Sequence, residues 1–188
     1  MRIVLASSSP RRIELLSRIR PDAVSVPSRI DEAGFDDLPP TSRVLALARA
    51  KAEDVARREA GLVIGADTLV VLDGETLGKP STDAEARRML VHLSGREHLV
   101  LTGLCVIRTE RGERREAVET TAVRFRALSR QEIDAYVATG EPRDKAGAYA
   151  IQGRAALFVD GITGDFYNVM GLPLARLAAL AREMGAAL

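Results

Sequence analysis

The stretch LASSSPRRIELL, residues 5–16, decides how the first part of this chain folds. The short apolar run at residues 3–6 predicts a strand, and three serines follow it. Ser9 is a good helix N-cap, and Pro10 suits the first helical position. An apolar stripe that starts at Ile13 and repeats every three residues then predicts a helix over residues 10–19. The stretch therefore predicts a strand, a serine-rich turn and a helix.

Two arginines occupy the first turn of this predicted helix. Cations at a helix N-terminus oppose the helix dipole, so stability alone does not account for Arg11 and Arg12. An anion bound there would account for them, because backbone N–H groups, the Ser7 hydroxyl and two guanidinium groups would then all reach phosphate oxygens. The alternative is a capped helix with solvated arginines, and this segment alone leaves both open.

Composition limits the classes of protein to consider. The 188 residues suit a single domain, 1–188, and the net charge of +1 argues against a general nucleic-acid coat or a membrane-surface protein. We therefore expect no nucleic-acid and no membrane partner. Cys105 is the only cysteine, and its apolar neighbours indicate a buried strand thiol. Because a single cysteine cannot form an internal disulfide, we expect a reducing, cytoplasmic location.

Strand-like and helix-like segments alternate along the chain. Strands are predicted near residues 2–6, 22–26, 62–72, 97–108, 115–127 and 156–160, and helices near 10–19, 42–59, 83–93, 130–138 and 173–184. The charged loop at 109–114 predicts an antiparallel hairpin between its two flanking strands. We expect an α/β fold in which helices flank a mixed central β-sheet.

One acidic residue interrupts a strand that is otherwise apolar. Asp67 follows Gly65 and Ala66, and these small residues would leave room for a ligand. A carboxylate in a buried strand is costly unless it is paired, hydrogen-bonded or bound to a metal. The alternative is an aspartate that ends a strand or anchors a turn. The strand context favours a functional residue.

Further candidates carry charge or an amide. Asp31 and Glu32 add carboxylates, and Glu32 with Asp67 would supply the oxygen ligands that Mg²⁺ or Mn²⁺ needs beside phosphate. The segment around Lys79 fails the P-loop pattern in its spacing, but Lys79 still suits phosphate. Lys145 follows Asp144, and a surface pair between the two is the alternative to a role in binding. The amide of Gln152 suits the edge of a pyrimidine base.

Taken together, these segments resemble the Maf family of nucleoside triphosphate pyrophosphatases. The matching pieces follow the family order over nearly the whole chain: Ser7 to Leu16, Asp31-Glu32, Ala50-Lys51-Ala52, Gly65 to Thr68, Gly78-Lys79-Pro80, Ser94-Gly95 with His98 to Gly103, Asp144 to Gly153, and Gly164-Asp165 with Asn168 to Leu174. No acidic, basic or glycine position departs from the pattern. The resemblance implies a fold similar to inosine triphosphate pyrophosphatases, with two lobes around a cleft.

The resemblance also implies an activity, which is hydrolysis of dTTP and UTP, and of modified pyrimidine nucleotides as a further option, to the monophosphate and pyrophosphate. By matching positions, Asp67 is the expected proton acceptor and Glu32 its companion in binding a divalent metal, Mg²⁺ or Mn²⁺. The expected phosphate ligands are Ser7, Arg11, Arg12, Lys51, Lys79 and Lys145. Specificity in this branch falls on Arg12, Thr68 and Gln152, and the sister branch that acts on 7-methyl-GTP has an acid in place of Gln152.

Two questions stay open at this point. The rival reading is a nucleotide-binding regulator of cell division and septum formation without turnover, although binding alone does not require a base such as Asp67. The sequence also leaves open whether the protein forms a homodimer.

Overall fold

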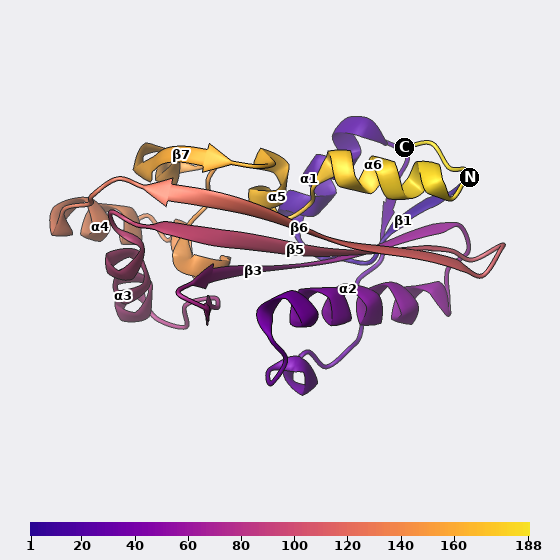
Figure 1. The fold of residues 1–188 in the computed structure, drawn as a ribbon, viewed down its shortest axis with the longest axis horizontal. Coiled ribbons are helices and arrows are strands. Elements are labelled where there is room, and N and C mark those ends of the chain that lie inside the picture. The colour runs from indigo at the N-terminus through magenta and orange to yellow at the C-terminus, as the bar shows by residue number, and fades with distance from the viewer. The chain divides into compact units, whose positions relative to one another are not determined.

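Three long strands organise the computed structural model, which describes residues 1–188 (Figure 1). The strands are β1 (Ile3–Leu5), β2 (Val24–Ser25), β3 (Leu62–Leu72), β4 (Glu75–Leu77), β5 (Glu97–Arg108), β6 (Glu113–Phe125) and β7 (Val159–Thr163). The α-helices are α1 (Pro10–Ile19), α2 (Pro40–Ala56), α3 (Asp83–Leu93), α4 (Arg130–Val137), α5 (Phe166–Met170) and α6 (Leu174–Glu183). Short 3₁₀ helices are η1 (Ala33–Phe35), η2 (Glu141–Asp144), η3 (Ala146–Ala148) and η4 (Arg154–Phe158).

The strands form one mixed sheet, in the order β2-β1-β3-β5-β6-β7, with β4 paired to β3. Strand β1 runs parallel to β2 and β3, whereas β4 runs antiparallel to β3 and β7 antiparallel to β6. Strands β5 and β6 are neighbours and are joined by only the residues 109–112, a connection short enough for an antiparallel hairpin alone. The predictions of a mixed α/β fold and of this hairpin are confirmed.

The chain divides into two compact units. The first comprises Met1–Thr68, Thr102–Glu119 and Gly171–Leu188, and the second comprises Leu69–Leu101 and Thr120–Met170. Strands β3, β5 and β6 each contribute residues to both units. In the first unit, α2 covers one face of the strands, and α1 and α6 lie on the other (Figure 1).

Two glycines let α2 approach the strands of the first unit very closely. A Cβ atom at Gly65 of β3 would lie 2.1 Å from the carbonyl oxygen of Ala48, and one at Gly103 of β5 would lie 2.2 Å from that of Val44. The prediction that Gly65 leaves room for a ligand is therefore wrong, because the backbone of α2 fills that space. The apolar face of α2 packs here beside the thiol of Cys105, which is buried as predicted.

An aromatic cluster forms the core of the second unit. The ring of His98 packs edge-on against Phe125 and Tyr149, and its Nε2 atom lies 2.8 Å from the Tyr149 hydroxyl. Tyr136 and Phe158 extend the cluster. Burial lowers the pKa of His98 to about 4 and raises that of Tyr149. The histidine is thus a neutral part of the core.

Most helices and strands lie where the sequence predicted them. Where the bounds differ from the prediction, the cause is local. Strands β3 and β5 and helices α1 and α3 have the predicted bounds. Helix α2 begins at Pro40, in the first helical position, rather than at residue 42. The last strand lies at Val159–Thr163 rather than 156–160, since residues 154–158 form η4. None of the helices is both long and apolar enough to cross a membrane.

Candidate functional site

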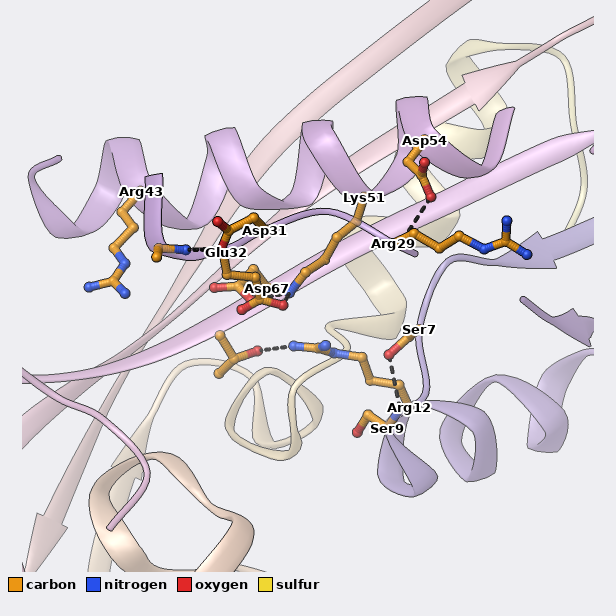
Figure 2. Close-up of polar contacts among 12 residues, drawn as sticks. Ser7, Ser9, Arg12, Arg29, Asp31, Glu32, Arg43, Lys51, Asp54 and Asp67 are labelled. Carbon is orange, nitrogen blue, oxygen red and sulfur yellow. Dashed lines mark hydrogen bonds and ion pairs between the residues drawn. The ribbon is translucent and has the colours of Figure 1, made fainter. Parts of the chain in front are cut away.

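A lysine links two carboxylates in the first unit (Figure 2). The Nζ atom of Lys51 lies 2.7 Å from Oδ1 of Asp67 and 2.8 Å from Oε1 of Glu32. Lys51 comes from α2 and Asp67 from β3, whereas Glu32 directly precedes η1. The Lys51 and Asp67 side chains are 9% and 11% exposed, and that of Glu32 is 56% exposed. The structure thus brings together three predicted site residues.

The close approach of α2 explains how Lys51 reaches Asp67. Gly65 lies two residues before Asp67 on β3, and its missing side chain lets Ala48 and Ala52 of α2 rest on the strand. Lys51 lies between these alanines in the sequence, so its side chain enters the buried region beside the strand. The helix–strand contact that Gly65 permits therefore positions the cation of this site.

The two carboxylates fit a hard divalent cation. Both carboxylates contact the same ammonium group, so their oxygens converge on one region. No cluster of three or more His, Cys, Asp and Glu side chains suited to a metal occurs in the chain. Mg²⁺ commonly binds to one or two carboxylates and completes its shell with water and substrate phosphate. The donor set thus suits a cation that is shared with a phosphorylated ligand.

Arg12 lies at the centre of a second group of contacts in the same unit. Its Nε atom donates to the carbonyl oxygen of Gly171 at 2.8 Å, and its Nη2 atom donates to Oγ1 of Thr68 at 2.9 Å. Thr68 Oγ1 also lies 2.9 Å from Oγ1 of Thr102, which is completely buried. Burial lowers the pKa of the Arg12 guanidinium, while the negative charge of Asp67 acts in the opposite direction.

The serine-rich turn has its own hydrogen bonds before α1. Ser7 is buried, and its hydroxyl accepts from the backbone N–H of Ser9 at 3.1 Å. Ser9 occupies the N-cap position with extended geometry and Pro10 follows it, as predicted, but its side chain makes no capping bond. The N-terminus of α1 therefore keeps backbone donors that no Ser9 hydroxyl satisfies.

Lys79 and Lys145 belong to the second unit. Lys79 is exposed and lies between β4 and α3. The backbone N–H of Gly147 donates to the carbonyl oxygen of Gly78 at 3.0 Å, so the segments that carry the two lysines are joined. The Nζ atom of Lys145 lies 2.6 Å from Oδ1 of Asp144, so the two neighbours form an ion pair.

Gln152 is exposed on a loop of the second unit that one carboxylate holds in place. Glu141 accepts from the Tyr136 hydroxyl at 2.9 Å and from the backbone N–H of Arg154 at 3.2 Å. The same Tyr136 hydroxyl accepts from the N–H of Ala150 at 3.2 Å. These bonds fix the loop on both sides of Gln152.

Sequence reasoning missed the residues that support the predicted ones. Thr102, Gly171 and Glu141 each contact a predicted site residue or its loop, but none carries a local signal of that role. Thr102 and Gly171 lie inside segments that matched the family pattern, and that match was the only sequence feature pointing to them. Their roles depend on contacts between distant segments.

A comparison with solved structures bears on the fold. The chain aligns with the solved structure of a HAM1 protein from Coxiella burnetii with a TM-score of 0.54 and 17% identity, over 97% of this chain and 99% of the other. At this identity the likeness concerns the fold alone.

The sequence comparisons then give the family. The model of the family described as Maf-like protein matches residues 2–184, and the chain belongs to this family. A dTTP/UTP pyrophosphatase of Moorella thermoacetica is 55% identical over 98% of this chain and 95% of its own length. A dTTP/UTP pyrophosphatase of Thermococcus onnurineus is 51% identical over 97% of each chain.

Proposed function

We propose that this protein is a nucleoside triphosphate pyrophosphatase that hydrolyses dTTP and UTP to the nucleoside monophosphate and pyrophosphate. The observation that carries this proposal is the buried Asp67, hydrogen-bonded to Lys51 and close to Glu32 through the shared ammonium group. The names of relatives at 51% to 55% identity, which are dTTP/UTP pyrophosphatases, support it.

Asp67 acts as the general base in this proposal. Its carboxylate accepts a proton from the attacking water while the water oxygen bonds to the α-phosphorus. The bond from the α-phosphorus to the oxygen that bridges to the β-phosphate breaks, and pyrophosphate leaves with the electron pair. The nearby Lys51 ammonium stabilises the negative charge that builds up on the phosphate oxygens.

Cations and hydroxyls bind the triphosphate. We assign this role to Ser7, Arg11, Arg12 and Lys51 of the first unit, and to Lys79 and Lys145 of the second. The bonds of Arg12 to Thr68 and Gly171 use two of its donors and hold the guanidinium plane, so the remaining N–H groups have a fixed direction. A preorganised arginine loses little rotamer entropy when the ligand binds.

Glu32 and Asp67 would hold a divalent cation, for which Mg²⁺ and Mn²⁺ are the candidates. Such a cation supplies neutralisation of phosphate charge and orients the phosphate chain. Lys51 contributes to the same neutralisation through its contacts with both carboxylates.

Base recognition falls to Thr68 and Gln152, and Arg12 holds the Thr68 hydroxyl through a hydrogen bond. No observation favours a regulator without turnover, and binding alone does not require a buried base.

The proposal is tested by measuring pyrophosphate release from dTTP and UTP by the purified protein with Mg²⁺ or Mn²⁺. Replacing a general base lowers turnover by roughly 10²- to 10⁴-fold, so Asp67→Asn should lose this much while it still binds the nucleotide. Asp54→Asn is the matched control, since Asp54 of α2 is also hydrogen-bonded but pairs with Arg58, just beyond the end of that helix. Absence of pyrophosphate release by the wild type, or full turnover by folded Asp67→Asn, contradicts the proposal.

A further inference from the structure

A tight turn of the second unit carries Gln152, a candidate for base recognition. The backbone N–H of Gly153 donates to the carbonyl oxygen of Ala150 at 3.0 Å, so residues 150–153 form a hydrogen-bonded turn with Gln152 as its third residue. The Gln152 side chain is exposed, and no hydrogen bond within the protein involves its amide. The direction of the amide therefore depends on how firmly the turn itself is held.

One carboxylate holds both ends of this turn. Oε2 of Glu141 accepts from the backbone N–H of Arg154 at 3.2 Å, just beyond the turn. Oε1 of Glu141 accepts from the Tyr136 hydroxyl at 2.9 Å, and this hydroxyl accepts from the N–H of Ala150 at 3.2 Å. Glu141 thus reaches the end of the turn directly and its beginning through Tyr136.

The groups involved fix the direction of these hydrogen bonds. A backbone N–H can only donate, so the Tyr136 oxygen accepts from Ala150 and its single proton goes to Glu141. Burial and the hydrogen bond with Glu141 raise the pKa of Tyr136, so the hydroxyl keeps this proton at neutral pH. Both oxygens of the Glu141 carboxylate therefore act as acceptors that hold the turn.

A glycine leaves the space that this carboxylate occupies. A Cβ atom at Gly153 would lie 2.3 Å from Oε1 of Glu141, so a larger residue would push the carboxylate away from the turn. The φ angle of Gly153 is −101°, outside the left-handed region that favours glycine. The close approach of Glu141, rather than the backbone conformation, accounts for a glycine directly after Gln152.

We propose that Glu141 and Tyr136 are positioning residues that hold the turn of residues 150–153 and so direct the amide of Gln152 toward the pyrimidine base. This inference rests on the proposed function. An amide in a fixed direction can donate to the carbonyl at position 4 of uracil and thymine and accept from N3–H. Cytosine has an amino group at position 4 and no proton on N3, so an amide held in this way opposes it. The pair thereby favours UTP and dTTP over CTP through Gln152.

The test compares kcat/KM for UTP and CTP in variants of the full-length protein. Tyr136→Phe keeps the ring that packs against Phe158 and removes the link to Ala150. We expect the UTP-to-CTP ratio to fall roughly 2- to 13-fold, the range for loss of one ordinary hydrogen bond. The fall should reside in KM for UTP more than in kcat. Glu141→Gln, which keeps only one acceptor oxygen, should lower the ratio in the same direction.

A second background separates positioning from general stability. Gln152→Ala leaves no amide to direct, so adding Tyr136→Phe to it should leave the ratio at the Gln152→Ala value. A purely structural role of Tyr136 would instead change the turnover of both nucleotides to the same extent in either background.

Tyr149→Phe is the matched control for Tyr136→Phe. Tyr149 is a buried tyrosine of the same unit and directly precedes the turn, but its hydroxyl bonds with His98. This variant should lower the melting temperature and leave the UTP-to-CTP ratio unchanged. If Tyr136→Phe does not fold, Glu141→Gln replaces it in the same comparisons.

The outcomes distinguish this inference from the proposed function. An unchanged ratio in folded Tyr136→Phe or Glu141→Gln, beside a lowered ratio in Gln152→Ala, overturns the role of the pair alone, as does a fall that adds in full to that of Gln152→Ala. An unchanged ratio in Gln152→Ala overturns base recognition by Gln152 as well. A wild-type protein that releases no pyrophosphate from UTP overturns the proposed function, and the inference with it.

Discussion

The Nζ atom of Lys51 lies 2.7 Å from Oδ1 of Asp67, and both side chains are about nine-tenths buried. Removing charges from water is costly, and such a pair is retained only where the partners compensate each other. Glu32 adds a second carboxylate to the same ammonium group. The one ammonium group therefore contacts two carboxylates, and the charge of Arg12 also acts on both of them.

Replacement of Lys51 tests this balance. Lys51→Met removes the cation but keeps the length of the side chain, so two carboxylates are left facing each other. We expect the free energy of unfolding in the presence of EDTA to fall by about 2–3 kcal/mol, below the largest values for buried pairs because Glu32 is half exposed. Mg²⁺ should then raise the melting temperature of the variant more than that of the wild type.

Arg49→Met is the control for Lys51→Met, since Arg49 also lies on α2 and pairs with a different carboxylate, Glu116. Its response to Mg²⁺ should equal that of the wild type. Equal Mg²⁺ responses in all three proteins would show that Lys51 does not compete with a cation for these carboxylates.

Gly65→Ala tests the close packing of α2 on β3. The new Cβ atom would lie 2.1 Å from the carbonyl oxygen of Ala48, so the helix must move away from the strand. We expect a loss of about 2–3 kcal/mol in the free energy of unfolding, as for other overpacked sites, together with reduced turnover because Lys51 moves with α2. Denaturant unfolding and pyrophosphate release measure the two effects.

Gly34→Ala provides the comparison for Gly65→Ala. A Cβ atom at Gly34 meets nothing within 4 Å, so this variant should unfold at the wild-type denaturant concentration or above it. A Gly65→Ala protein as stable as Gly34→Ala would show that α2 does not pack closely on β3 at Gly65.

His98 should make the second unit sensitive to acid. Its folded-state pKa of about 4 lies below the value of 6.5 for an unperturbed histidine, so the unfolded chain binds a proton more readily. Stability is therefore complete above pH 6.5 and is lost as the pH falls toward 4, by up to about 3 kcal/mol. Urea unfolding of wild type and His98→Gln at several pH values isolates this contribution as a difference.

The exposed His92 serves as the reference for this experiment. His92→Gln should keep the acid sensitivity of the wild type, whereas His98→Gln should reduce it. A His98→Gln protein whose stability falls with acid as steeply as that of the wild type would assign the effect to other groups.

Gln152→Glu tests base recognition from the second unit. An amide can donate to the carbonyl at position 4 of uracil and accept from its N3–H, whereas a carboxylate can only accept. Loss of an ordinary hydrogen bond costs about 0.5–1.5 kcal/mol, so turnover of UTP and dTTP should fall roughly 2- to 13-fold and that of CTP should fall less. Gln131→Glu, the same change at an exposed position of α4, should leave the UTP-to-CTP ratio of kcat/KM intact.

Elements with strong local signals were predictable from the sequence. Pro10 after Ser9 gave the start of α1, and the Ser129–Glu132 capping box that begins α4 is present with both of its hydrogen bonds. Helix α5 was missed because the stretch around it, residues 161–173, is rich in turn residues. The signal that would have revealed it is Asp165, whose carboxylate accepts from the N–H groups of Tyr167 and Asn168 as an N-cap does.

The acidic and basic residues of the site were also predictable, but their supports were not. Asp67 is conspicuous as a carboxylate in an apolar strand, and Lys51 comes from a segment that matched the family pattern. Gly65 was misinterpreted because its neighbour is a helix from another part of the chain, which no local pattern reveals. Thr102 was missed for the same reason, since its meaning depends on the residue across the sheet.

The hydrogen bond between Arg12 and Gly171 joins residues that are 159 positions apart, and it lies in a unit built from three separate segments of the chain. During synthesis on a ribosome, Arg12 emerges early and Gly171 emerges near the end. The second unit is made entirely in between. A chain that ends before Gly171 therefore keeps only the Thr68 contact of Arg12, and the second contact that orients the guanidinium group forms only after almost the whole chain has been made.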